Sequence, residues 1–144
     1  MNLTEQTVEH WIERAKQIAT VAHEGQKRTN GSPYINHPAR IADKAELRLK
    51  PIAWLHDVPE DTNVTLEDLK REGFPTYILA AVDLLTHRKG DTNMAYWKKI
   101  LTNPDAVSVK LMDIQDNMGE TPSEYAKEKY GRALALFKQA GYSL

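Results

Sequence analysis

The apolar residues of this chain recur at intervals of three and four positions, and no segment of useful length alternates between apolar and polar residues. An interval of three or four places side chains on one face of an α-helix, whereas strict alternation would indicate a half-buried strand. The clearest case lies between Thr4 and Gln26, which we expect to form one amphipathic helix. Its apolar stripe consists of Val8, Trp11, Ile12, Ala15, Ile18, Ala19 and Ala22. The pattern predicts an all-α fold, built as a helical bundle.

Start and stop signals divide the rest of the chain into further helices. Thr65 is a candidate N-cap, and Gly73 is the expected stop of the same helix. The run Thr121-Pro122-Ser123-Glu124 has the pattern of a capping box with Thr121 as the cap, and the helix that follows should end at Gly141. The other helices are expected to begin near Pro38, Pro51, Pro75, Thr92 and Pro104.

Composition limits the classes of protein to which the chain can belong. Its 144 residues, 41% of them hydrophobic, can fill the core of one compact domain, which we place at 1–144. The formal net charge of −1 gives no reason to expect a nucleic-acid partner. The absence of cysteine excludes disulfides and thiolate zinc sites and is compatible with a cytoplasmic location. Neither a signal-peptide pattern nor an apolar run of membrane length is present, so we expect no membrane partner, and the oligomeric state stays open.

His56 and Asp57 are the centre of a candidate metal site. They follow the apolar run 52–55, so two polar groups arrive at the edge of a core, where a charge is costly unless it is paired or binds a metal. His37 upstream and Asp113 downstream could complete a mixed nitrogen and oxygen set around one divalent ion of the Mn, Fe, Zn or Mg kind. The alternative is a helix that ends in solvated polar residues.

Glu60 and Asp61 form an acidic pair next to this candidate site. Pro59 disfavours helical backbone at Val58, so the helix that begins at Pro51 should end or kink there and place both carboxylates on the next turn. Carboxylates in such a position could orient or deprotonate a water molecule at the ion. The alternative is an acidic cluster on a solvated loop.

Asp113 and Asn117 lie four positions apart and therefore share one face of a helix that is otherwise apolar. An aspartate in such surroundings needs a partner, which could be Lys110 or a metal ion. We expect Asp116 to face solvent. His23 continues the apolar stripe of the first helix and is equally compatible with a packed histidine and with a role in a site.

Basic residues cluster at two places, Lys27-Arg28 and Arg88-Lys89. An arginine can bind phosphate through two parallel hydrogen bonds and can stack on a base. An ordinary charged surface is the alternative, and we favour it for Lys27 and Lys89.

Three segments, taken in order, resemble one known family. The first is His23–Arg28 with Gly31–Pro38, the second is Trp54–Thr62, and the third is Val109–Asp113 with Asn117. They are similar to the opening motif, the HD and ED motifs and the last metal motif of the HD-domain alarmone hydrolases. That family contains the hydrolase domains of Rel/Spo homologues and the stand-alone small alarmone hydrolases.

The resemblance implies an all-helical HD-domain bundle that contains one divalent ion, with Mn²⁺ as the usual metal of the family. It implies removal of the 3′-pyrophosphate of ppGpp or pppGpp, which gives GDP or GTP and pyrophosphate, so the partner is a small nucleotide. By position, it assigns the ion to His37, His56, Asp57 and Asp113, and the activation of water to Glu60 and Asp61. It also places Arg28 against the guanine base, with Tyr34, Lys110 and Asn117 shaping the nucleotide pocket.

Three places depart from residues that are common in the family: Thr29, Ile114 and Gly119-Glu120. They lie among the expected substrate contacts, so two alternatives stay open. One is an HD-domain phosphohydrolase that acts on a different nucleotide. The other is a non-catalytic module that binds a nucleotide, although pure binding would not need the acidic pair Glu60-Asp61.

Overall fold

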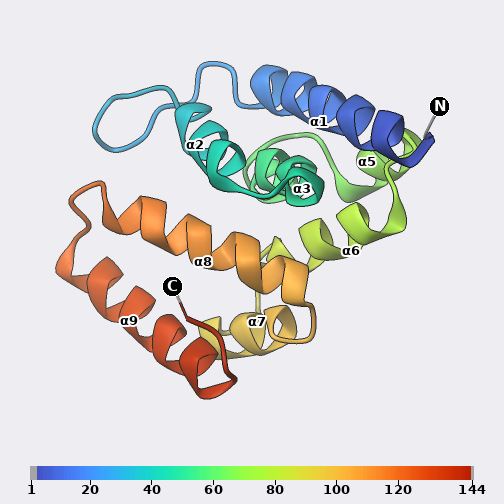
Figure 1. Ribbon diagram of the computed structural model, residues 1–144. Helices are drawn as coiled ribbons and strands as arrows, with labels where there is room; N and C mark the ends of the chain where they lie inside the picture. Colours follow the sequence, from blue (N-terminus) through green and yellow to red (C-terminus); the bar gives the residue numbers. More distant parts are fainter. Residues whose placement is uncertain (1–2, 144) are drawn as a thin grey trace.

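The chain consists of helices and loops throughout residues 3–143, the range that the computed structural model describes (Figure 1). Within this range the only β pairing is one isolated bridge between Lys27 and Pro33. The prediction of an all-α fold is confirmed. In the same part of the chain no helix is both long and apolar enough to cross a lipid bilayer.

Two helices hold the described structure together. The short helix α3 (Lys50–Leu55) packs against α1 (Leu3–Ala22), α2 (Asn36–Lys44) and α6 (Thr76–Leu85). The longer helix α8 (Pro104–Met118) packs against α2, α6, α7 (Asn93–Ile100) and α9 (Glu124–Gln139) and lies between the two halves of the fold in Figure 1. The remaining short elements are the 3-10 turn η1 (Leu47–Leu49), α4 (Val58–Asp61) and α5 (Leu66–Arg71).

The apolar stripes meet in one core between these helices. Ile52, Ala53 and Leu55 of α3 are completely buried, and so are Val109 and Ile114 of α8. Burial of each valine, leucine or isoleucine side chain among them contributes about 1.5–3 kcal/mol. The core therefore holds α3 and α8 in place, and the polar residues His56 and Asp113 lie against it.

The expected break after α3 is confirmed. Helix α3 ends at Leu55, and α4 begins at Val58 with Pro59 in its first turn. His56 and Asp57 occupy the joint between the two helices, and Glu60 and Asp61 lie on α4. The first helix, by contrast, ends at Ala22 rather than near Gln26.

A tight loop follows α1 and carries most of the first family-like segment, His23–Arg28 with Gly31–Pro38. Gly25 and Gly31 have φ values of 82° and 88°, a left-handed conformation that residues with a Cβ rarely adopt. The Arg28 N–H donates to the Ser32 carbonyl over 2.8 Å, and the Tyr34 N–H donates to the Gln26 carbonyl over 2.9 Å. These bonds bring Arg28 and Tyr34 next to the start of α2.

The predicted cap at Thr121 is wrong. Thr121 has a φ of 52° and lies outside the helix, and Ser123 caps α9 by accepting from the Ala126 N–H. At Thr65 the prediction is confirmed, since both hydrogen bonds of a capping box link Thr65 and Asp68. The difference arises because Thr121 belongs to the turn between α8 and α9, whereas Thr65 has the extended backbone that a cap requires.

The two threonines therefore provide a stability test. We expect Thr65→Ala to lower the free energy of unfolding by about 1 kcal/mol, because the substitution removes the cap. Thr121→Ala should leave it unchanged or raise it slightly, since alanine is less crowded than a β-branched residue at positive φ. Urea unfolding followed by circular dichroism measures both values. An equal loss in the two variants would contradict the assignment of the caps.

Candidate metal centre and active site

Four side chains from three distant segments converge at the junction of α2, α3 and α8. Each of His37, His56, Asp57 and Asp113 offers one nitrogen or oxygen atom, and these four atoms lie within 4.8 Å of one another. His37 and His56 are 1% and 2% exposed, and Asp113 is 5% exposed, so the cluster is almost fully buried. The structure thus brings together all four residues that the sequence predicted as ligands.

His56 is oriented by the backbone of α3. Its Nδ1 lies 2.6 Å from the Ala53 carbonyl oxygen, which can only accept, so Nδ1 carries the hydrogen. Although burial acts to lower the pKa of His56, the carboxylates of Asp57 and Asp113 outweigh it and raise the pKa, so without an ion Nε2 also carries a hydrogen, 3.0 Å from Asp57 Oδ2 and 3.3 Å from Asp113 Oδ1. A divalent ion at this point could take the place of that hydrogen, because Nε2 and the two carboxylate oxygens converge there.

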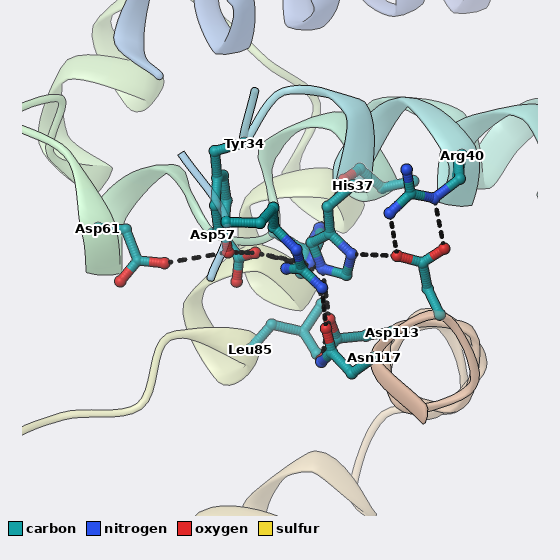
Figure 2. Close-up of polar contacts among 12 residues, drawn as sticks. Tyr34, His37, Arg40, Asp57, Asp61, Leu85, Asp113 and Asn117 are labelled. Atoms are coloured by element: carbon teal, nitrogen blue, oxygen red, sulfur yellow. Dashed lines mark hydrogen bonds and ion pairs between the residues drawn. The ribbon is translucent and has the colours of Figure 1, made fainter. Parts of the chain in front are cut away.

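His37 repeats this arrangement through a carboxylate. Its Nδ1 lies 2.6 Å from Asp116 Oδ2, and Arg40 binds both oxygens of Asp116 (Figure 2). Burial acts to raise the pKa of Asp116, but the hydrogen bonds from Arg40 and His37 outweigh it, so the net shift is downward and the carboxylate stays ionised. The His37 Nδ1–H donates to this carboxylate, and Nε2 faces Asp113 Oδ1 at 2.8 Å. The prediction that Asp116 faces solvent is wrong, because its side chain is 8% exposed.

This donor set fits a divalent cation. Two imidazole nitrogens and two carboxylate oxygens converge, and each imidazole has its other nitrogen held by an acceptor, as is usual for ligands of metals. Burial acts to raise the pKa of Asp57, but the adjacent His56 outweighs it and lowers the pKa to about 2. A metal ion at the centre of the cluster would replace the imidazolium charge of His56 as the positive partner of the two carboxylates.

Tyr34 and Lys110 hold the two carboxylates of the cluster from outside. The Tyr34 hydroxyl donates to Asp57 Oδ2 over 2.6 Å (Figure 2). Lys110 Nζ lies 3.0 Å from Asp113 Oδ2. Burial would lower the pKa of Lys110, but Asp113 outweighs it and raises the pKa, so the amine stays charged. Both residues therefore support the cluster as well as lining the cavity in front of it.

The acidic pair lies on the wall of the same cavity. One oxygen of Glu60, Oε1, accepts from the backbone N–H of His87 over 2.6 Å, which leaves Oε2 free to face the cavity. Asp61 Oδ2 lies 3.5 Å from the Tyr34 hydroxyl (Figure 2). Partial burial raises the pKa of Glu60, and the charges of Asp61 and Asp57 add to this shift and outweigh the opposing His87 N–H. Glu60 is therefore a stronger base than a glutamate with the ordinary pKa.

The cavity has a volume of about 270 Å³. It adjoins a second hollow of about 630 Å³, and the two share Arg28, Tyr34, Asn117 and Tyr130 in their walls. Cations also line the inner cavity, where Lys110 and Lys129 are found together with the imidazole of His87. The combined space offers carboxylates and histidines at the inner end, cations along the wall, and an aromatic and guanidinium surface toward the second hollow.

Arg28 lies where the two hollows meet. Its Nε donates to Glu120 Oε2 over 2.8 Å, and a second nitrogen donates to Asn117 Oδ1 over 2.7 Å. Its guanidinium carbon lies 5.4 Å from the centre of the Tyr34 ring. Two of its five N–H donors are bound, so Arg28 can offer a ligand its remaining donors and the face of the guanidinium that does not lie toward Tyr34.

Some residues of this region were not found by sequence reasoning. Asp116 and Arg40 act behind His37, and Glu120 acts behind Arg28. One signal was available, since Asp113, Asp116 and Asn117 share a helix face at spacings of three and four. The cavity residues His87, Tyr96, Lys129 and Tyr130 carry no motif that would have singled them out. His23 is buried and donates through Nδ1 to Gln26 behind Tyr34, so it takes the packed alternative.

Comparisons with known proteins show what this chain is similar to. No protein-family model matches the chain. A GTP pyrophosphokinase of Streptomyces coelicolor is 45% identical over a match that covers 74% of this chain and 14% of that protein. A guanosine-3′,5′-bis(diphosphate) 3′-pyrophosphohydrolase of Aquifex aeolicus is 37% identical, over 74% of this chain and 17% of that protein. This chain thus spans less than a fifth of the length of these two curated relatives.

A solved structure matches over a larger share of both chains. It belongs to a metazoan ortholog of SpoT, with a TM-score of 0.66, 23% identity, and coverage of 87% of this chain and 80% of that chain. This match shows that the chain has the all-α HD-domain fold. More closely, the chain belongs to the HD-domain family that includes the matched segments of the guanosine-3′,5′-bis(diphosphate) 3′-pyrophosphohydrolases.

Proposed function

We propose that this chain is a metal-dependent pyrophosphohydrolase that removes the 3′-diphosphate of guanosine tetraphosphate or pentaphosphate. The observation that carries the proposal is the convergence of His37, His56, Asp57 and Asp113 within 4.8 Å, on a cavity whose wall also contains Glu60 and Asp61. The names of the Aquifex relative and of the metazoan ortholog, which is described as hydrolysing ppGpp, support this substrate. The pyrophosphokinase name of the Streptomyces relative concerns a much longer protein, and the acidic pair favours hydrolysis for this segment.

We propose His37, His56, Asp57 and Asp113 as the ligands of one divalent ion, with Mn²⁺ as the expected metal. When bound, such an ion supplies Lewis acidity that polarises a phosphoryl oxygen and lowers the pKa of water. The chain itself provides the orientation of the ligands. Ala53 and Asp116 fix the two imidazoles, and Tyr34 fixes Asp57.

Glu60 and Asp61 are proposed to handle the proton of the attacking water. Glu60 Oε2 is the free oxygen with the raised pKa, and it would accept that proton as the water attacks phosphorus. Asp61, next to the Tyr34 hydroxyl, would hold the water in line. As the bond between phosphorus and the 3′ oxygen breaks, Lys110 and Lys129 would offset the charge of the departing diphosphate, and the proton taken from water would end on the 3′ oxygen of the nucleoside.

The nucleoside would lie where the two hollows join. The flat face of Arg28 can stack on a base, and Tyr34 and Asn117 border the same space. A second candidate function follows from this contact, because stacking does not by itself distinguish guanine from another base. The alternative substrate is therefore another nucleotide that carries a diphosphate.

One experiment distinguishes the proposed hydrolysis of ppGpp from hydrolysis of another nucleotide and from binding without catalysis. Purified protein is incubated with Mn²⁺ and a panel that includes ppGpp, pppGpp, GDP and ADP, and the products are identified by anion-exchange chromatography and ³¹P NMR. The proposal expects GDP and pyrophosphate from ppGpp and no reaction without metal. Orthophosphate as the product, or cleavage of a different nucleotide alone, would point to the second candidate. Tight binding of ppGpp without any product would indicate a non-catalytic module.

The rate should also depend on pH through Glu60. Glu60 must be deprotonated to accept a proton, and its pKa is raised above the ordinary glutamate value. We therefore expect kcat to fall as the pH drops, with a midpoint above pH 4.5, the reference value for glutamate. Turnover measured from pH 4.5 to 8 at saturating metal checks this. In Glu60→Gln this limb should be absent, and its persistence would assign it to another group.

A further inference from the structure

A chain of ion pairs runs behind the site and connects Arg28 with His37. Arg28 Nε donates to one oxygen of Glu120, and the other oxygen of Glu120 pairs with Arg40. Arg40 binds both oxygens of Asp116, at 2.7 and 2.9 Å. Asp116 in turn lies 2.6 Å from His37 Nδ1. Four alternating charges thus link the side chain that faces the nucleotide to a proposed ligand of the ion.

Arg40 is the central member of this chain. Arg40 is absent from the walls of both hollows. Among the described residues, it is the cation that pairs with both Asp116 and Glu120. In Figure 2 the Arg40 and His37 side chains approach the same carboxylate from α2, while that carboxylate belongs to α8. The three groups therefore also tie helix α2 to helix α8.

The surroundings make this cation necessary. The side chains of Asp116 and Glu120 are only 8% and 17% exposed, so water compensates their charges poorly. The carboxylate of Asp113 lies on the other side of His37. Without Arg40, Asp116 would repel the charges of the cluster and would be favoured to turn away. His37 Nδ1 would then lose the acceptor that directs Nε2 toward the ion.

We propose that Arg40 is a positioning residue for both halves of the site. Through Asp116 it holds the His37 ring so that Nε2 faces the ion. Through Glu120 it holds the Arg28 guanidinium beside Tyr34, with its flat face toward the nucleotide. The proposal rests on the metal site of the proposed function, but it does not depend on which nucleotide is cleaved.

The first test measures metal binding without any nucleotide. Mn²⁺ is titrated into metal-free protein by isothermal calorimetry. Arg40→Ala should bind Mn²⁺ about 10–100-fold more weakly than the unaltered chain, the range found for groups that orient metal ligands. Arg40→Lys should recover part of the loss, because an amine restores the charge but not the two-point contact. The result that would overturn the proposal is an equal Mn²⁺ affinity in Arg40→Ala and the unaltered chain.

Arg48 provides the matched control. It binds both oxygens of Asp105, at 2.7 and 2.9 Å, and its side chain is 48% exposed against 41% for Arg40. Arg48→Ala therefore removes a similar ion pair outside the site. It should leave Mn²⁺ affinity unchanged, and an equal loss in both variants would assign the effect to general destabilisation and overturn the proposal.

A double-mutant cycle tests the route through Asp116. Asp116→Asn should weaken Mn²⁺ binding in the same direction as Arg40→Ala, and the double variant should be little weaker than Asp116→Asn alone. Additive losses would show that Arg40 acts by another route. If Arg40→Ala does not fold, then Arg40→Lys and Asp116→Asn decide the same question.

The route through Glu120 has its own readout. Glu120→Gln should leave Mn²⁺ affinity nearly unchanged, because Arg40 keeps Asp116, and it should weaken ppGpp binding because Arg28 loses its charged partner. Unchanged ppGpp binding would remove Arg28 from the proposal. If the protein binds Mn²⁺ but does not cleave ppGpp, the proposed function is contradicted. The Mn²⁺ titrations of the Arg40 and Asp116 variants then still test the positioning role of Arg40. Protein that does not bind Mn²⁺ at all would overturn both.

Discussion

Replacing Asp57 with alanine should abolish turnover and metal retention together. Asp57 contributes one of the four atoms of the cluster and lies 3.0 Å from His56 Nε2. Its loss leaves two imidazoles and the carboxylate of Asp113. Because Asp113 is already paired with Lys110, these three groups should hold a cation poorly. We expect Mn²⁺ affinity to fall by more than about 100-fold, beyond the range for groups that only orient ligands.

The measurement is metal content after gel filtration, together with Mn²⁺ titration and initial rates. The Tyr34 hydroxyl also loses its acceptor in Asp57→Ala, at a cost of about 1–3 kcal/mol, so circular dichroism must show that the variant is folded. Asp57→Asn keeps an acceptor for Tyr34 and should show the same loss of metal. Asp43→Ala, an exposed position on α2, is the control and should behave like the unaltered chain. An Asp57→Ala variant that retains metal and full activity would refute the assignment.

Glu60→Gln should keep the metal and lose the rate. Glutamine has the shape of glutamate, and its Oε1 can still accept from the His87 N–H, so the turn of α4 is preserved. It cannot take a proton from water at neutral pH, and loss of a general base lowers kcat by about 10²–10⁴-fold. Single-turnover kinetics with ppGpp at saturating Mn²⁺ measures this effect, and Mn²⁺ titration should show an unchanged affinity.

The exposed Glu67 of α5 is the control for this substitution, since Glu67→Gln removes the same charge outside the cavity. Asp61→Asn separates the two members of the acidic pair. A severe loss in Asp61→Asn with a mild one in Glu60→Gln would exchange their roles. Undiminished turnover in both variants would remove the pair from the mechanism.

The helices were largely predictable because they depend on local sequence. The apolar spacing of α1, the capping box at Thr65 and the break at Pro59 each involve residues within a few positions of one another. Thr121 shows the limit of this approach. Its sequence has the pattern of a cap, but the turn between α8 and α9 forces Thr121 to a φ of 52° and passes the cap to Ser123.

The family resemblance and the polar residues at the ends of apolar runs predicted the four candidate ligands. The short distances between their side chains, however, depend on how distant helices pack. His37 and Asp113 are 76 positions apart, and they meet because α2 packs against α8. The residues that were missed show the same dependence. Asp116 was predicted to face solvent, but it is a partner of His37 because α2 packs against α8 at this point.

What the sequence determined by itself is the helical class, the order of the helices and the residue types that can carry the chemistry, since each follows from periodicity, caps and side-chain functional groups. What only the tertiary structure decided is which nitrogen of each histidine faces the cluster, which oxygen of Glu60 accepts from the His87 N–H, and how Arg40 links Asp116 beside His37 to Glu120 beside Arg28. The physical reason is that hydrogen bonds and ion pairs act over about 3 Å, and the packing of distant helices alone brings these groups within that distance.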